Sequence, residues 1–147
     1  MIDRQARDNF AEILRHLAAG QITNDEFEDR MPLKSKDAAV NRIFWAGAWH
    51  LYDDMREYKL AGKYRLPRDH KREVAKWILF LKSDFEYQYP KSLRVLDYIH
   101  PLLAIFSLGL AVPILRYYHN KLRDPAIWPF SNRIDYEHAL ANPPYLQ

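Results

Sequence analysis

The sequence predicts an all-α fold, and composition is the main reason. Among its 147 residues, leucine occurs 18 times and alanine 15 times, whereas valine occurs four times and threonine once. Unbranched and small side chains favour helices, while β-branched side chains favour strands. In addition, no stretch alternates apolar and polar residues for long enough to predict a strand. We therefore expect one domain over residues 1–147, built as a bundle of about six helices.

The first 31 residues predict a helical hairpin. The first helix carries one apolar face, at Phe10, Ile13, Leu14 and Leu17. Gly20 follows as an expected C-terminal cap, because glycine accepts the left-handed conformation that a helix exit requires. Thr23 and Glu26 then match a capping box, which predicts the start of a second, short helix. Phe27 and Met31 would form the inner face of that helix.

Residues 14–28 resemble the short bacterial helical hairpin called SHOCT. That module pairs a leucine-rich helix with a turn and a second helix of the pattern G-x-I-T-x-x-E-F. The matching stretch here is Gly20-Gln21-Ile22-Thr23-Asn24-Asp25-Glu26-Phe27. The resemblance implies a bacterial or phage origin and a role in assembly, with no chemistry of its own.

A long central helix is predicted over residues 35–60. One apolar stripe runs along it through Val40, Ile43, Phe44, Gly47, Leu51, Met55 and Tyr58. A second stripe, about 100° around the helix, comprises Trp45, Ala48, Trp49 and Tyr52. A helix that is apolar on nearly all sides usually lies at the centre of a bundle. The small residues at 46–48 predict that another helix approaches closely at this point.

Two more helices and an irregular arm complete the expected domain. One helix is predicted to begin near Arg68, with Val74, Trp77, Ile78 and Leu81 on its buried face. Another follows Pro90, with Leu93, Leu96 and Ile99 facing inward. Residues 35–122 would form the core of the bundle. Residues 123–147, rich in proline and aromatic residues, predict an arm over it, with a short helical segment at 134–140.

A basic segment over residues 59–76 is the leading candidate for binding. It holds seven cations and two anions, a net charge of +5, whereas the whole chain has +3. Such a surface fits an acidic partner, and a protein is favoured over nucleic acid because no recognition pattern for nucleic acid is evident. Arg68, Lys71 and Arg72 share one helix face. They also lie at a helix N-terminus, where the dipole disfavours cations, which points to an external reason for them.

Two other groups on the predicted central helix are candidates for sites. Trp45, Trp49 and Tyr52 flank small residues and predict either core packing or an aromatic contact surface. The second group is a polar stripe formed by His50, Asp53, Asp54 and Glu57. Imidazole and carboxylate groups at this spacing are typical ligands of a divalent metal, which gives a metal-dependent enzyme as the alternative function. An ordinary solvent-exposed stripe is the favoured interpretation.

An apolar run at residues 98–115 allows a second alternative. From Pro101 to Leu115 no residue is charged. Fifteen helical residues span about 22 Å, which is short of the roughly 30 Å hydrocarbon layer of a membrane. We expect a core hairpin here, with a membrane anchor as the alternative.

The remaining motifs exclude several classes of function. The chain has no cysteine and four isolated glycines, so it holds neither a thiolate site nor a phosphate-binding glycine loop. No secretion signal is expected at the N-terminus. We therefore predict a cytoplasmic interaction or assembly protein without catalysis and without a cofactor. Its partner would be another protein or a second copy of the chain.

Overall fold

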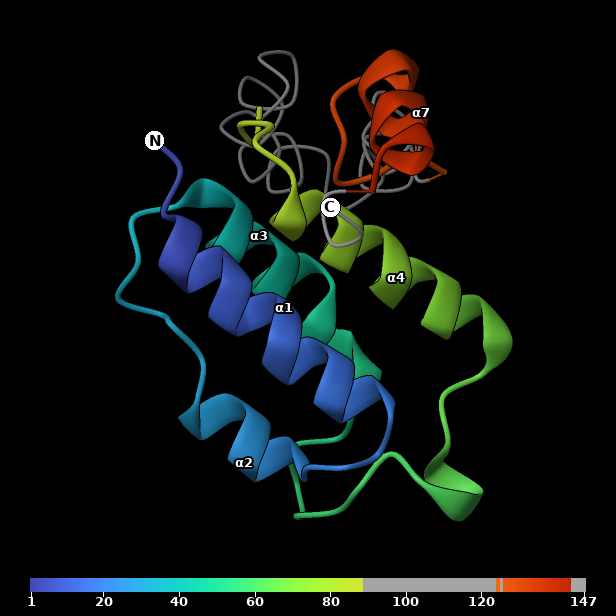
Figure 1. The fold of residues 1–147 in the computed structure, drawn as a ribbon. Helices are drawn as coiled ribbons and strands as arrows, with labels where there is room; N and C mark the ends of the chain where they lie inside the picture. Colours follow the sequence, from blue (N-terminus) through green and yellow to red (C-terminus); the bar gives the residue numbers. More distant parts are fainter. Residues whose placement is uncertain (89–123, 125, 144–147) are drawn as a thin grey trace, which may run out of the picture.

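The computed structural model describes residues 1–88, 124 and 126–143 (Figure 1). This part of the chain is helical, as predicted, with five α-helices, two short 3-10 turns and no strand. The predicted helix after Pro90 and the apolar run at 98–115 lie outside these residues. The α-helices are α1 (Arg4–Ala18), α2 (Asn24–Asp29), α3 (Ala38–Ala46), α4 (Arg68–Lys82) and α7 (Arg133–Ala141), and the 3-10 turns are η1 (Ala48–Leu51) and η2 (Gly62–Tyr64).

The predicted start and stop signals of the N-terminal hairpin are confirmed. Gly20, just after α1, has a φ angle of 70°, in the left-handed region that glycine tolerates best. At the start of α2, the backbone N–H of Glu26 donates to the Thr23 hydroxyl over 3.1 Å. The backbone N–H of Thr23 donates in return to the Glu26 carboxylate over 2.9 Å, which completes the capping box.

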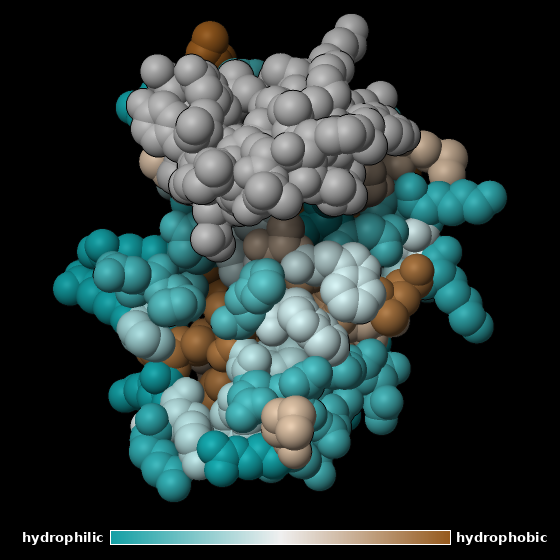
Figure 2. Space-filling view, turned by 180° about the vertical axis from the view of Figure 1, so that it is seen from behind, coloured by the Kyte–Doolittle hydropathy of each residue, from teal (hydrophilic) through white to brown (hydrophobic). Residues whose placement is uncertain are grey.

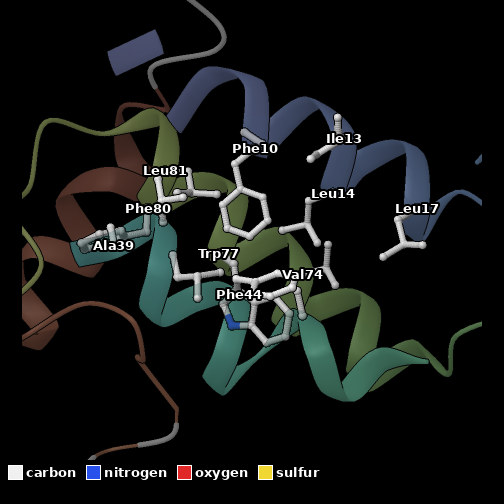
Figure 3. Close-up of a cluster of buried hydrophobic side chains, with 14 of the residues drawn as sticks. Phe10, Ile13, Leu14, Leu17, Ala39, Phe44, Val74, Trp77, Phe80 and Leu81 are labelled. Atoms are coloured by element: carbon white, nitrogen blue, oxygen red, sulfur yellow. The ribbon is translucent and has the colours of Figure 1, made fainter. Parts of the chain in front are cut away.

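The core lies between α1, α3 and α4. In Figure 1, α1 lies in front of α3, and α4 runs beside them in the direction opposite to α1. Side chains from all three helices point into the space between them (Figure 3). The predicted apolar faces of α1 and α4 are confirmed, because their residues are buried in this cluster, with Ile78 partly buried: Phe10, Ile13, Leu14 and Leu17 on α1, and Val74, Trp77 and Leu81 on α4. Its large, almost fully buried members include Phe10, Leu14, Leu17, Val40, Ile43, Phe44, Phe80 and Leu81, together with Phe27 from α2.

The prediction of one long helix over residues 35–60 is wrong. Helix α3 ends at Ala46, and Gly47 leaves the helical conformation with φ −134° and ψ −77°. The ring of Trp77 on α4 packs so closely that a Cβ atom on Gly47 would lie 2.9 Å from it. The close approach expected at residues 46–48 therefore occurs. After the single turn of η1, the chain continues as an irregular loop to Ala61.

A buried ion pair joins three helices at one end of the core. The Arg7 guanidinium donates to both carboxylate oxygens of Asp37, over 2.6 and 3.2 Å. The side chains of both residues are at least 98% buried. Asp37 is also the N-cap of α3 and accepts from the backbone N–H of Ala39 over 2.8 Å. Arg7 uses its remaining nitrogen to donate to the carbonyls of Ser83 and Phe85, just beyond α4.

The described C-terminal residues pack against α4 through aromatic rings. Trp128 contacts Trp77 edge to face with 5.7 Å between ring centres. Phe130 contacts Phe80 in the same way at 5.0 Å. The helical segment predicted at 134–140 is confirmed as α7, which lies beside the C-terminal half of α4 (Figure 1).

The membrane alternative concerns residues that the structure does not describe. The apolar run at 98–115 falls outside the described ranges. Of the helices within those ranges, none has the length and apolarity needed to span a bilayer. A membrane anchor at 98–115 therefore stays a prediction.

The Arg7–Asp37 pair yields a first prediction on stability. Substituting Arg7→Met keeps much of the side-chain volume but leaves the Asp37 carboxylate buried without its cation. We expect the free energy of unfolding to fall by about 3–5 kcal/mol in urea denaturation. Arg15→Met is the matched control on the exposed side of α1, where Arg15 pairs with Glu12 at 3.0 Å and is half exposed; its effect should stay below about 0.5 kcal/mol. Equal losses in the two variants would contradict the role given to the buried pair.

The same pair predicts how stability depends on pH. Burial alone would raise the pKa of Asp37, but hydrogen bonds from Arg7 and from the backbone N–H groups of Asp3 and Ala39 outweigh it and hold the pKa below the usual 3.8. Because the folded-state pKa is lower than the unfolded one, this stabilisation is complete above the unfolded pKa. It is lost as the pH falls through the folded pKa.

Asp37→Asn removes the titrating group and serves as the comparison. We expect wild type to exceed the variant in free energy of unfolding at about pH 7, and the difference to shrink below about pH 4. Urea denaturation of both proteins between about pH 7 and pH 2 measures this difference in free energy of unfolding. A difference that stayed constant down to about pH 2 would contradict the assignment.

Candidate functional site

The predicted basic segment forms an exposed surface at one end of the molecule. Its cations come from the loop around η2 and from the first two turns of α4. Within the described part of the chain, five of them form no ion pair: Lys59, Lys63, Arg65, Arg68 and Lys71. We call these five residues the basic surface. Arg72, the other predicted contact residue, lies beside them and pairs with Asp69 at 3.5 Å.

Cations elsewhere in the described residues are mostly paired with carboxylates. On α1, Arg4 lies 3.9 Å from Asp8 and Arg15 lies 3.0 Å from Glu12. Lys82 at the end of α4 reaches Asp8 at 2.8 Å. The basic surface is therefore a local concentration of charge that forms no ion pair with the described residues.

Two tyrosines extend the basic surface, and their position there was not predicted from the sequence. The rings of Tyr58 and Tyr64 lie 4.7 Å apart between centres. The guanidinium of Arg56 lies over both rings, 5.7 Å from Tyr58 and 5.2 Å from Tyr64. Lys63 lies 4.9 Å from the Tyr64 ring. These cation–π contacts fix the positions of two cations at the edge of the surface. No local pattern signals the contact, because it forms across an irregular loop.

The first turn of α4 receives no side-chain cap. Pro67 occupies the N-cap position, and no side chain accepts a hydrogen bond from the first turn. Helix N-termini carry a partial positive charge, so Arg68 and Lys71 lie where cations are electrostatically unfavourable. Asp69 is the one acidic residue in this turn. The arrangement adds to the unneutralised positive potential of the basic surface.

The four residues of the predicted metal stripe do not share a helix face, because α3 ends before them. His50 lies in η1, whereas Asp53, Asp54 and Glu57 belong to the following loop. All four side chains are exposed, and Glu57 accepts a hydrogen bond from the Thr23 hydroxyl over 2.8 Å. Across the described ranges, no three His, Asp or Glu side chains are placed to hold a metal ion together. The metal hypothesis assumed that these four residues lie along one helix, and that prediction is wrong.

The predicted aromatic residues form a connected row at the end of α3. Trp45 and Trp49 lie 5.3 Å apart between ring centres, and Trp49 lies 6.0 Å from Tyr52. The row continues inward to Phe44 and Phe27, so its inner part is core. Trp45 is 53% exposed. Figure 2, the view from behind, shows pale and brown side chains across the middle of that face.

The hydroxyl group of Tyr52 is buried, and acidic residues act on it electrostatically. Burial, followed by the negative charge of Glu28, raises the pKa of the Tyr52 hydroxyl above its ordinary value, and Asp54 and Asp25 contribute in the same direction. The aromatic row thus ends in an acidic environment. Cations, rather than anions, would be attracted to it.

A buried asparagine fastens the loop that carries these groups. Asn24 on α2 is 1% exposed. Its amide nitrogen donates to the carbonyls of Arg56, over 3.0 Å, and Asp53, over 3.4 Å. Its amide oxygen accepts from the backbone N–H of Tyr58 over 2.8 Å. Because all of these bonds end on one loop, Asn24 sets the position of residues 53–58 relative to α2.

Removal of this side chain should loosen the loop more than the core. Asn24→Ala leaves three partly buried backbone groups of residues 53–58 without these partners, which costs about 1–3 kcal/mol. We expect limited trypsin digestion at Arg56 to become at least several-fold faster, while helical circular dichroism is retained. The control is Asn9→Ala on the exposed face of α1, which should leave the cleavage rate unchanged. Equal cleavage rates in wild type and Asn24→Ala would contradict this role.

The chain was also compared with known proteins. No family model, no curated protein and no solved structure matches it. The resemblance of residues 14–28 to the SHOCT hairpin therefore stays a prediction. What can be concluded about function comes from the arrangement of charges and rings described above.

Proposed function

We propose that this chain is a non-catalytic interaction or assembly protein that binds an acidic protein partner through the basic surface. The observation that carries the proposal is that Lys59, Lys63, Arg65, Arg68 and Lys71 have no ion pair within the described ranges. Exposed like charges repel one another and weaken the folded state. A partner with opposite charge removes that repulsion on binding and steers the encounter.

The position of the cations on α4 supports an external role. Acidic side chains in the first turn of a helix would stabilise it, and cations there do the opposite. Residues that lower stability without a structural contact are typical of surfaces used for function. The proposal includes a bundle of about six helices closed by a C-terminal arm, in a bacterial cytoplasmic protein.

Charge reversal on α4 tests the proposal with poly-glutamate as the acidic probe. For Arg68→Glu/Lys71→Glu, we expect fluorescence anisotropy at low salt to show binding weakened at least about tenfold. The matched control is Lys34→Glu/Lys36→Glu, which makes the same change in net charge at two exposed positions outside the surface. Its affinity should change by less than about twofold.

Thermal unfolding separates lost binding from lost folding. Glutamate in the first turns of α4 complements the helix dipole, so Arg68→Glu/Lys71→Glu should unfold at the same temperature as wild type or slightly higher. Equal binding by both charge-reversal variants would contradict the proposal. If a uridine oligonucleotide of equal charge binds more tightly than poly-glutamate, the partner is a nucleic acid and not an acidic protein.

A further inference from the structure

An acidic surface lies beside the basic one. Helix α2 and the loop after η1 carry six carboxylates that form no ion pair with any described residue. They are Asp25, Glu28, Asp29, Asp53, Asp54 and Glu57, and we call them the acidic surface. Only Glu26, between them on α2, is paired, with Arg30 at 3.8 Å.

The two surfaces are joined but do not neutralise each other. Thr23, at the start of α2, forms an isolated antiparallel bridge with Lys59. The Thr23 hydroxyl also donates to Glu57 over 2.8 Å. Figure 1 shows α2 and η2 at the same, lower end of the molecule. No ion pair between described residues runs from one surface to the other. Opposite charges thus lie at one end of the molecule, and the described residues form no ion pair between them.

An apolar group lies within this charged end. Met55, in the loop that links the two surfaces, is 86% exposed. The loop itself is held in place by Asn24, and the Tyr58–Tyr64 pair borders it. Protein interfaces are enriched in methionine, tyrosine and arginine at their centres, with polar rims. Figure 2 shows that the rest of this lower end is largely hydrophilic.

We propose that this end of the molecule is an interface between two copies of the chain. The basic surface of one copy binds the acidic surface of the other, and a two-fold axis passes near Met55. In a two-fold dimer each copy presents the same patch, so a patch with separate positive and negative halves complements itself. Five cations then face six carboxylates in each of two equivalent contacts. The inference rests on the proposed function, because it names the acidic partner of the basic surface as a second copy.

The first test measures the mass of the full chain in solution. Charge pairing is screened by salt, since the Debye length falls from about 20 Å at low ionic strength to about 4 Å near 0.5 M. At low salt and rising protein concentration, sedimentation velocity should show a species of twice the 17.6 kDa chain mass. In about 0.5 M salt the monomer should return. A monomer under all conditions, or a mass that grows beyond the dimer, would overturn the inference.

The second test exchanges charges between the surfaces. Arg65→Glu/Arg68→Glu reverses part of the basic surface, and Asp29→Lys/Asp54→Lys reverses part of the acidic surface. None of these four side chains forms an ion pair with a described residue, and Glu at position 68 and Lys at position 29 both suit the local helix dipole. Each variant alone should be at least tenfold weaker in dimerisation. An equal mixture of the two should restore the dimer, because every reversed charge then meets its opposite.

Lys34→Glu/Lys36→Glu is the control and should dimerise like wild type. A mixture that stays monomeric, or single variants that still dimerise, would overturn the inference.

Poly-glutamate binding by the Asp29→Lys/Asp54→Lys variant distinguishes the two proposals, because this variant retains the basic surface. If it binds poly-glutamate while wild type never dimerises, only the interface is wrong. If wild type dimerises and poly-glutamate does not bind, the interface stands, and the basic surface binds the acidic surface of a second copy but not acidic chains in general.

Discussion

The hydrogen-bonded ion pair between Arg7 and Asp37 determines how the helices meet. Asp37 begins α3, Arg7 lies in the first turn of α1, and Arg7 also reaches the carbonyls that follow α4. Arg4 reinforces the contact by donating to the carbonyls of Leu81 and Lys82. Free backbone carbonyls at a helix C-terminus attract cations, so both arginines bind where the α4 dipole favours them. One end of the three-helix core is thereby fixed.

The contact of Arg7 and Arg4 with the end of α4 explains why the basic and acidic surfaces lie at the opposite end of the core. Helices α1 and α4 have 15 residues each and run in opposite directions. With the C-terminus of α4 held at the start of α1, the N-terminus of α4 must lie near the end of α1, beside the hairpin that leads into α2. Asn24 then brings the loop at 53–58 against α2. Cations and carboxylates that are far apart in sequence therefore share one end of the molecule.

Local signals in the sequence predicted the elements, but not the contacts between them. The capping box at Thr23 and the left-handed Gly20 act within a few residues, and the apolar faces of α1 and α4 follow from helical periodicity. The basic surface was also predictable, because its cations are neighbours in sequence.

The Arg7–Asp37 pair joins residues 30 positions apart and carries no local pattern. The end of α3 depends on Trp77, which packs from another helix, and the error displaced His50, Asp53, Asp54 and Glu57 from their expected alignment.

Charged side chains are arranged differently at the two ends of the core. At the Arg7 end, Arg4, Arg7 and Lys82 pair with carboxylates and help to hold the helices together, while Lys34 and Lys36 are exposed. At the other end, the five cations of the basic surface lie at a helix N-terminus and in a loop and form no ion pair with described residues, although unpaired carboxylates lie on the adjoining α2. Side chains as long as lysine and arginine could reach an acidic neighbour if stability were the only constraint. Opposite charges that stay unpaired although they lie at the same end are expected on a surface that binds another molecule.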